Sequence, residues 1–243
     1  MKTMRSYLSF GGGVNSVAML LMLHEQKQDF EAVFVNHGTD WPETYEYLEM
    51  LQGWLEKKGL PKITVLYPLY GGNSNLYDYC WRLKIVPVIH PRWCTSNFKV
   101  RVLHKHYKSP AFELIGIDAS EKHRAKISVT KDIEKRYPLL EAEINRDGCK
   151  DIIKAHKLPV PMKSGCYICP FQKTAQWKQL RRVHPDLFCK AEKLEKRNEE
   201  YRLSIGKKPM YLSPKKAPLS AIVNEKQSKL WEADEYPPCN CML

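Results

Sequence analysis

The first third of the chain alternates short apolar runs with longer segments in which apolar residues recur at helical spacing. The short runs predict buried strands, and the longer segments predict helices with one apolar face. The predicted elements are a strand at 7–10, a helix at 16–27, a strand at 32–35, a helix at 41–58 and a strand at 63–66. This alternation predicts right-handed strand–helix–strand units in a parallel sheet.

The pattern becomes less regular after the third predicted strand. Residues 68–92 are rich in Gly, Asn, Tyr and Pro, which is typical of a long functional loop with a short helix inside it. Beyond it, the pattern predicts helices at 94–107 and 149–156, strands at 112–117 and around 137–140, and charged helix from 177 onward. We therefore predict an α/β fold with a domain boundary near residues 145–160.

Three consecutive glycines, Gly11, Gly12 and Gly13, separate the first predicted strand from the first predicted helix. Such a turn directs backbone N–H groups toward one point, and the amino terminus of the helix adds partial positive charge there. Glycine also lets a phosphate approach the chain without meeting a Cβ atom. No Lys-Ser or Lys-Thr pair closes the turn, so it differs from the P-loop of ATPases. The turn predicts either a phosphate cradle or a tight strand–helix connection without a ligand.

Composition narrows the class of protein. The chain has 243 residues, of which 43% are hydrophobic, and no run approaches the roughly 20 apolar residues of a membrane span. We expect a cytoplasmic protein with no membrane partner, because the first residues also lack the pattern of a signal peptide. The net charge of +12 favours a polyanionic partner or an anionic substrate, although a generally basic surface would give the same balance.

Eight cysteines favour metal or redox chemistry over disulfides in a chain expected to be intracellular. Cys166 and Cys169 form a Cys-x-x-Cys motif followed by proline, a spacing that brings two thiolates to one metal ion or cluster. Cys94 is the best candidate for a third ligand because it begins a predicted helix. The positive end of that helix, together with Arg92 and Lys99, is expected to lower the pKa of Cys94.

The fourth metal ligand is open between Cys149, Cys80 and a cysteine of the carboxyl-terminal tail. An iron–sulfur cluster is favoured, with structural zinc or a redox dithiol as alternatives, because thiolates bind both metals. Cys239 and Cys241 in the tail could swing into a site, carry sulfur or resolve a disulfide, or they could be an incidental pair. Cys80 and Cys189 have large apolar neighbours and are more often core residues than ligands.

Single histidine and aromatic residues carry weaker signals. A lone histidine such as His37 is more often a hydrogen-bonded structural residue than a ligand. Tyr77, Trp93 and Trp177 could stack on a base, but core packing is the more common role for such side chains.

Five segments, in order, resemble motifs of the phosphoadenosine phosphosulfate (PAPS) reductase family, which is part of the adenine nucleotide alpha-hydrolase (PP-loop ATP pyrophosphatase) superfamily. The segments are residues 9–16 (S-G-G-x-D-S in the family), 35–44 (D-T-G-x-x-F-P-E-T), 92–99 (R-x-C-T and a lysine), 116–124 (G-I-x-A-x-E-x-x-R) and 164–186 (the cysteine-containing part of iron–sulfur members). Together these segments span most of the chain.

The resemblance implies a doubly wound parallel sheet in a Rossmann-like PP-loop domain, residues 1–145, and a smaller, mostly helical, cysteine-containing region, residues 146–243. It implies ATP or an adenylyl sulfate nucleotide at the carboxyl ends of the strands, with Mg²⁺ and a [4Fe-4S] cluster. The nucleotide-binding residues assigned on this basis are Ser9, Gly11, Gly12, Gly13, Ser16, Asn36, Gly38, Lys99, Gly116, Glu121 and Arg124. The metal ligands assigned are Cys94, Cys166, Cys169 and Cys149.

Some positions depart from the family pattern. Asn15 stands where the loop usually carries an aspartate that helps to hold Mg²⁺, and Asn36 replaces the aspartate of D-T-G. Asparagine can ligate a metal or form hydrogen bonds, but it brings no charge. The loss of two carboxylates would suit a more anionic ligand or a weak or inactive hydrolase. Asn15 is assigned as a catalytic residue, together with Cys239 and Cys241 of the tail.

Three functions remain open. The first is ATP-dependent sulfur transfer, in which a group of tRNA or DNA is adenylated and sulfur from a cluster, a cysteine or a donor protein displaces AMP. The second is a sulfonucleotide reductase with a tail cysteine, although the Pro-Cys-Asn-Cys tail and the Trp93-Cys94 pair depart from the reductase pattern. The third is a nucleotide- or nucleic-acid-binding module without catalysis. Charge, the three cysteines and the basic carboxyl-terminal helices favour the first.

Overall fold

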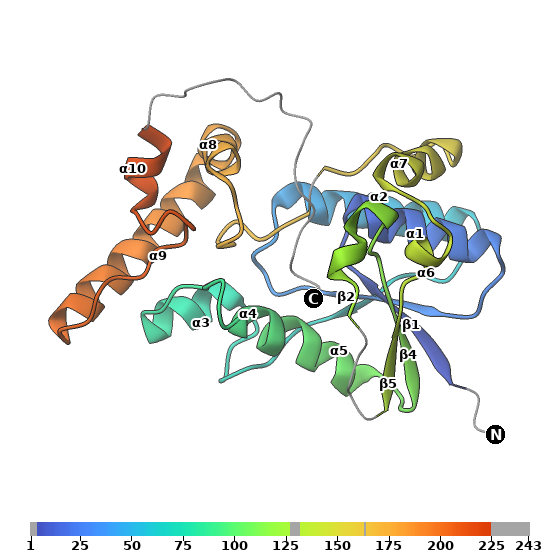
Figure 1. Ribbon diagram of the computed structural model, residues 1–243, viewed down its shortest axis with the longest axis horizontal. Helices are drawn as coiled ribbons and strands as arrows, with labels where there is room; N and C mark the ends of the chain where they lie inside the picture. Colours follow the sequence, from blue (N-terminus) through green and yellow to red (C-terminus); the bar gives the residue numbers. More distant parts are fainter. Residues whose placement is uncertain (1–3, 127–131, 163, 225–243) are drawn as a thin grey trace.

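Five parallel strands form the centre of the protein. The computed structural model describes residues 4–126, 132–162 and 164–224. The strands are β1 (Arg5–Phe10), β2 (Glu31–Val35), β3 (Thr64–Leu66), β4 (Ala111–Ile115) and β5 (Ile133–Arg136), and their order in the sheet is β3-β2-β1-β4-β5 (Figure 1). The chain thus builds outward from β1 through β2 to β3, and then crosses to the other side of β1 for β4 and β5.

Both faces of the sheet are buried, and the alternation along β1 and β2 decides which side chain faces which layer. Leu8 and Phe34 belong to one apolar cluster, whereas Tyr7 and Val33 belong to another. Residues that are adjacent in a strand, such as Tyr7 and Leu8, therefore point to opposite faces of the sheet, as strand geometry requires. A parallel sheet with both faces covered explains the nearly continuous apolar runs in these strands.

Helices cover the two faces of the sheet unequally. One layer contains α1 (Val14–Glu25), α2 (Pro42–Lys57), α6 (Pro138–Glu141) and α7 (Arg146–Ala155), while α5 (Arg101–His106) lies on the other face (Figure 1). α1 is buried from Val14 to Leu23, because it lies between the sheet and α7 and shares an apolar cluster with α2. The predicted doubly wound α/β fold is confirmed.

A third apolar cluster, the helical cluster, lies beside the sheet and is built mainly by helices. It joins α3 (Leu76–Leu83) and α4 (Trp93–Thr95) to α8 (Thr174–Val183), α9 (Pro185–Ser204) and α10 (Leu219–Asn224). Trp177 of α8 is wholly buried in this cluster, as the expectation of core packing required. The helical carboxyl-terminal region therefore packs against the long loop after β3.

Two predicted elements differ from the structure. The fifth strand was predicted around 137–140 but lies at 133–136, because Pro138 starts the short helix α6 instead. The predicted helix at 94–107 is divided into α4, a π-helical turn at Ser96–Val100 and α5. The division at residue 145 stays a prediction, but α7 packs on α1 and so shares the core of the sheet layer.

Among the described residues, no helix combines the length and apolar character that crossing a membrane requires.

Candidate functional site

The candidate site lies at the carboxyl ends of β1 and β4, which are neighbours in the sheet. The chain leaves β1 toward β2 on one side, and reaches β4 and β5 on the other. Loops after the two strands therefore diverge, and open α/β sheets bind their ligands in the crevice that such a divergence creates. Gly11–Gly13 follow β1, and Gly116–Asp118 follow β4.

Close packing requires glycine at two positions of the loop after β1. Gly12 has a φ of +71°, and a Cβ there would come within 2.9 Å of Thr44 Cγ2. A Cβ on Gly13 would come within 2.8 Å of Ser164 Oγ. The loop is thus enclosed by α2 on one side and by the cysteine-containing segment on the other.

The amino terminus of α1 carries backbone N–H groups that no side chain caps. Gly13 is the N-cap residue and makes no side-chain capping bond, and the first turn of α1 has no acidic residue. The Ser16 hydroxyl donates a hydrogen bond to the Gly13 carbonyl at 2.9 Å. Uncapped N–H groups, the helix dipole and a glycine loop together make a favourable place for a phosphate.

Asn15 is the centre of a buried polar network. Its amide nitrogen lies 3.1 Å from the Gly116 carbonyl, 2.9 Å from Asp118 Oδ2 and 3.3 Å from Glu121 Oε2. Arg146 donates a hydrogen bond to Asn15 Oδ1 at 2.6 Å. A neutral amide therefore connects the loops after β1 and β4 to α7, where a carboxylate would face two other carboxylates.

Glu121 and Arg124, which were assigned to nucleotide binding, form an i,i+3 ion pair with each other. Burial raises the pKa of Glu121, and the adjacent Arg124 opposes that rise. Asp118 accepts hydrogen bonds from the backbone N–H and the hydroxyl of Ser120, which fixes the turn after β4. The network presents both acidic and basic groups to the loop.

A second polar group lies at the end of β2. His37 is 1% exposed, and its Nδ1 lies 2.7 Å from Thr39 Oγ1, while its Nε2 lies 3.4 Å from Asp40 Oδ2. Burial lowers the pKa of His37 to about 4, so the ring is neutral at physiological pH. The expectation that His37 is a hydrogen-bonded residue agrees with these contacts. Asn36 accepts a hydrogen bond from the N–H of Gly38 at 2.9 Å and so shapes the turn.

The cysteine-containing segment is attached to this end of β2. The Trp41 N–H donates to the Gly165 carbonyl at 2.9 Å, and the Tyr167 N–H donates to the Thr39 carbonyl at 2.8 Å. The Cys166 thiol lies 3.0 Å from Thr39 Oγ1. These contacts, with Ser164 against Gly13, place a buried thiol next to the candidate phosphate site.

The structure groups the cysteines differently from the assigned ligand set. Cys94, Cys166 and Cys169 all belong to the helical cluster beside the sheet, and so does the wholly buried Cys80. Cys149 belongs instead to the core under α1, where Asp118 and Arg146 lie near it. The structure therefore does not bring Cys149 to the other assigned thiols, because α7 packs on the sheet layer.

The thiols of this site are held in their neutral form. Burial raises the pKa of Cys94, although Thr95 and Lys99 oppose that rise, so the prediction of a lowered pKa is wrong. Burial also raises the pKa values of Cys80 and Cys166, and in each case the nearby Cys94 adds to the rise. Cys94 is thus near both of these thiols.

Metal binding requires a closer arrangement than this one. Within residues 4–126, 132–162 and 164–224, no set of three or more His, Cys, Asp or Glu side chains is arranged to hold a metal ion. As they are placed, the thiols do not fit an iron–sulfur cluster, and Asp118 and Glu121 are engaged by Asn15 and Arg124.

The other assigned residues are distributed around the loop. Gly116 packs on the start of α1, where a Cβ would come within 3.2 Å of the Ser16 nitrogen. The charge of Lys99 contributes to the lowered pKa of His37 and opposes the rise in the pKa of Cys94. Lys99 therefore lies near both residues. The Ser9 side chain bonds to Tyr107, on the face that α5 covers. Cys239 and Cys241 lie outside the described residues.

Sequence reasoning missed four residues of the site: Thr39, Asp118, Arg146 and Ser164. Asp118 and Ser164 stood inside segments that had been singled out, but nothing in their spacing marked them as contacts of the loop. Arg146 is more than a hundred residues from Asn15 and begins α7, a helix whose position on α1 the sequence could not reveal. For Arg146 there was one signal in the sequence, namely the apolar pattern that predicted a helix at 149–156, in the region of α7.

Comparisons with known proteins found a family model, a relative and a solved structure to which this chain is similar. Residues 5–109 match the family model of the phosphoadenosine phosphosulfate reductase domain. A protein of Methanocaldococcus jannaschii described as uncharacterized is 23% identical over 239 residues, which cover 91% of this chain and 56% of that protein. The chain thus spans little more than half the length of that relative. The phosphate complex of PAPS reductase from Candida auris is similar with a TM-score of 0.47 and 16% identity, over 66% of this chain and 76% of that one.

Proposed function

We propose that this protein is a PP-loop enzyme that performs sulfur chemistry with an adenine nucleotide, because residues 5–109 match the family model of the phosphoadenosine phosphosulfate reductase domain. The nucleotide is ATP or an adenylyl sulfate. Its phosphates lie against Gly11–Gly13 and the amino terminus of α1, and the rest of the nucleotide lies along the carboxyl ends of β1 and β4.

One observation carries this proposal, namely the attachment of the thiol segment to the nucleotide loop. Ser164 packs on Gly13, and the Cys166 thiol is hydrogen-bonded to Thr39 at 3.0 Å. A strand–helix turn that served only as a connection would not require contact with a cysteine-containing segment that follows it by about 150 residues in the sequence. Proximity of thiol and phosphate is the arrangement that sulfur transfer to or from a nucleotide-activated group needs.

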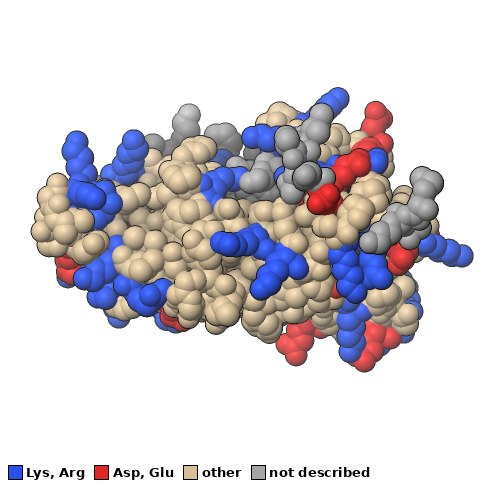
Figure 2. Space-filling model, turned by 90° about the horizontal axis from the view of Figure 1, so that it is seen from below, with Lys and Arg blue, Asp and Glu red and all other residues tan. Residues whose placement is uncertain are grey.

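The reaction that we propose is adenylation of a nucleic acid group followed by sulfur transfer. An oxygen of tRNA or DNA attacks the α-phosphorus of ATP, and pyrophosphate leaves from the glycine loop. A sulfur nucleophile then displaces AMP. The net charge of +12 favours a polyanionic substrate, and Figure 2 shows separate groups of lysine and arginine side chains on one face of the molecule.

The protein's own residues have defined roles in this proposal. The loop N–H groups stabilise the charge that develops on pyrophosphate, and Arg146 and Arg124 add positive charge next to the loop. Thr39 holds the Cys166 thiol toward the loop, and Lys99 compensates negative charge near Cys94. Mg²⁺, when bound with the nucleotide, would neutralise phosphate charge. Iron–sulfur ligation by Cys94, Cys166 and Cys169 was predicted from the sequence, but the thiols as they are placed do not fit a cluster, and no step is assigned to one.

Release of pyrophosphate from ATP tests the proposal. Anaerobically purified protein should release it only when tRNA or DNA is present, and Ser16→Ala should reduce the rate by about tenfold through loss of a loop contact. Release without dependence on nucleic acid would contradict the proposed acceptor. No release under any condition would contradict adenylation and favour a binding module.

A sulfonucleotide reductase is the second candidate, and Asn15 favours it. Asn15 gives the loop no carboxylate for Mg²⁺, and transfer of sulfur from an adenylyl sulfate to a cysteine does not require the cleavage of pyrophosphate. Formation of sulfite from an adenylyl sulfate in the presence of a dithiol, without any nucleic acid, would support this candidate over the first.

A further inference from the structure

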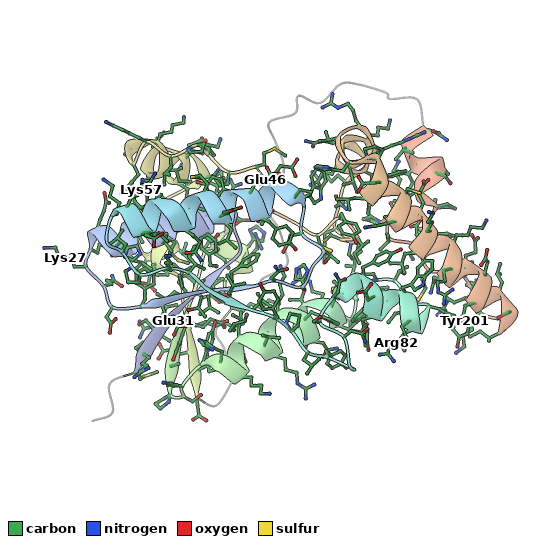
Figure 3. The ribbon with its side chains drawn as sticks, turned by 180° about the vertical axis from the view of Figure 1, so that it is seen from behind. Lys27, Glu31, Glu46, Lys57, Arg82 and Tyr201 are labelled. Atoms are coloured by element: carbon green, nitrogen blue, oxygen red, sulfur yellow. The ribbon has the colours of Figure 1, made fainter. Side chains whose placement is uncertain are left out.

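Exposed aromatic side chains gather where α3 and the carboxyl-terminal half of α9 lie side by side. Trp81 of α3 and Tyr201 of α9 are each 37% exposed, although large aromatic side chains are usually well covered. Figure 3 shows Arg82 and Tyr201 at this outer end of the helical region, far from the sheet. We define the α3–α9 surface as Tyr77, Trp81, Lys84, Arg197 and Tyr201.

A cation covers each of the two exposed rings. The guanidinium of Arg197 lies 4.5 Å from the centre of the Trp81 ring, and the ammonium of Lys84 lies 4.8 Å from the centre of the Tyr201 ring. Both distances are within the range of a cation–π interaction. A guanidinium held next to an indole offers a further planar, positively charged group on which another ring can stack.

The aromatic rings continue inward from this surface to the thiol segment. Tyr77 and Trp81 are stacked, with centroids 6.0 Å apart and an interplanar angle of 18°. Tyr77 also contacts Tyr167 at 6.2 Å, and Tyr167 directly follows Cys166 in the sequence. A row of rings thus connects the outer end of α3 with the segment that packs on the nucleotide loop.

The charges around the α3–α9 surface are mainly positive. Residues 190–208 contain seven lysines and arginines and four glutamates. Of the glutamates, Glu195 is buried and bound to backbone N–H groups, and Glu199 is bound to Tyr211. Figure 2 shows basic side chains gathered over the end of the molecule that α3 and α9 form, with few acidic ones among them.

Packing between the helices explains part of this arrangement but not all of it. Arg197 Nε donates a hydrogen bond to the Trp81 carbonyl at 2.9 Å, and Asn198 donates one to the Lys84 carbonyl at 2.8 Å. These bonds cap the end of α3 and hold α9 against it. They do not require aromatic rings whose outer edges are open to solvent and covered by cations.

We propose that the α3–α9 surface is the docking surface for single-stranded nucleic acid. This inference rests on the proposed function and names the place where its nucleic acid substrate is held. Unpaired bases stack on tyrosine, tryptophan and arginine planes, and the surrounding lysines and arginines contact phosphates. A duplex keeps its bases stacked inside and cannot use this surface in the same way. A strand bound here extends along Tyr77 toward the thiols and the nucleotide.

Binding of labelled 12-nucleotide single strands, followed by fluorescence anisotropy with the full-length protein, tests this proposal. Trp81→Leu keeps an apolar side chain against α9 but removes the stacking ring, and it should weaken binding about tenfold. Arg197→Gln should weaken binding, because the guanidinium plane on which a base stacks is lost, and it should reduce the slope of log K against log salt, because a positive charge is removed. The matching duplex should bind more weakly than either single strand.

Lys58→Gln is the matched control for Arg197→Gln. Lys58 lies over Trp54 at 5.9 Å, which is the same kind of pair on α2, outside the α3–α9 surface. Equal binding by wild type, Arg197→Gln and folded Trp81→Leu would overturn the surface assignment, and so would stronger binding of the duplex. If pyrophosphate release still depended on nucleic acid in that case, only the docking surface would be wrong. If wild type bound no single strand, this proposal would fail, and pyrophosphate release would decide separately on the proposed function.

Discussion

Asn15 is the residue that links the loop after β1 to the loop after β4 by hydrogen bonds. Its amide donates toward Asp118 and Glu121 and accepts from Arg146, so both ends of one neutral side chain are used. An aspartate could accept from Arg146 but could not donate to two carboxylates. The departure from the family's loop is therefore compensated by the residues that surround it in this chain.

Asn15→Asp should destabilise the protein, because three carboxylates would then crowd within hydrogen-bonding distance. We expect a loss of about 2 kcal/mol in the free energy of unfolding at pH 8 in EDTA. Mg²⁺ or a lower pH should restore part of this loss, since either one neutralises a carboxylate. Urea unfolding measures the change.

Asn36→Asp is the control for that substitution. Asn36 accepts a hydrogen bond from the Gly38 N–H, and an aspartate can accept the same bond. The change in charge and shape is identical, but we expect less than about 0.5 kcal/mol of destabilisation. Equal losses in the two variants would show that the network around Asn15 has no special role.

The cysteines lie in two different apolar clusters, so we expect their substitutions to have different effects on iron binding. If the protein binds an iron–sulfur cluster, Cys80→Ala should lose most of the bound iron after anaerobic reconstitution, because Cys80 adjoins Cys94. Cys149→Ala should keep the iron content of wild type, because Cys149 lies in the other core. The opposite result would restore Cys149 as a ligand, and absence of iron in wild type would exclude the predicted cluster.

At the scale of elements, α9 organises the end of the described chain. The Glu195 carboxylate accepts hydrogen bonds from the Leu212 N–H at 2.7 Å and the Leu219 N–H at 2.8 Å. The second bond ties the start of α10 to α9. Burial raises the pKa of Glu195 to about 7, with smaller contributions from Glu192 and Glu199, while the two backbone bonds oppose the rise.

Glu195 should make stability depend on pH in a defined direction. Between pH 4.5 and 7 the folded protein binds more protons at this group than the unfolded chain, so stability falls as pH rises through that range. We expect wild type to lose on the order of 2–3 kcal/mol relative to Glu195→Gln between pH 5 and pH 8, measured by urea unfolding. Glu200→Gln, at an exposed position of the same helix, should follow wild type. A difference between wild type and Glu195→Gln that did not change with pH would contradict this role.

At the scale of the whole molecule, the features that could be predicted from the sequence are those that depend on neighbouring residues, such as strands and tight turns. The strands at β1, β2 and β4 and the glycine turn followed from apolar runs and from the turn after Phe10. The pairing of Cys166 with Thr39 and of Arg146 with Asn15 depended on contacts across more than a hundred residues, which periodicity does not encode. The same reason explains the assignment of Cys149, because helix α7 could not be placed on α1 from sequence alone.

Binding of ATP, measured by titration calorimetry, tests the central claim that the nucleotide's phosphates lie against the loop after β1. Wild type should bind ATP, and Gly13→Ala should bind about tenfold more weakly, since the added Cβ comes within 2.8 Å of Ser164 and narrows the cradle. Gly53→Ala on α2, where a Cβ meets no atom within 4 Å, should bind as wild type does. Equal affinity of Gly13→Ala and wild type, or no binding of ATP by wild type, would contradict the account.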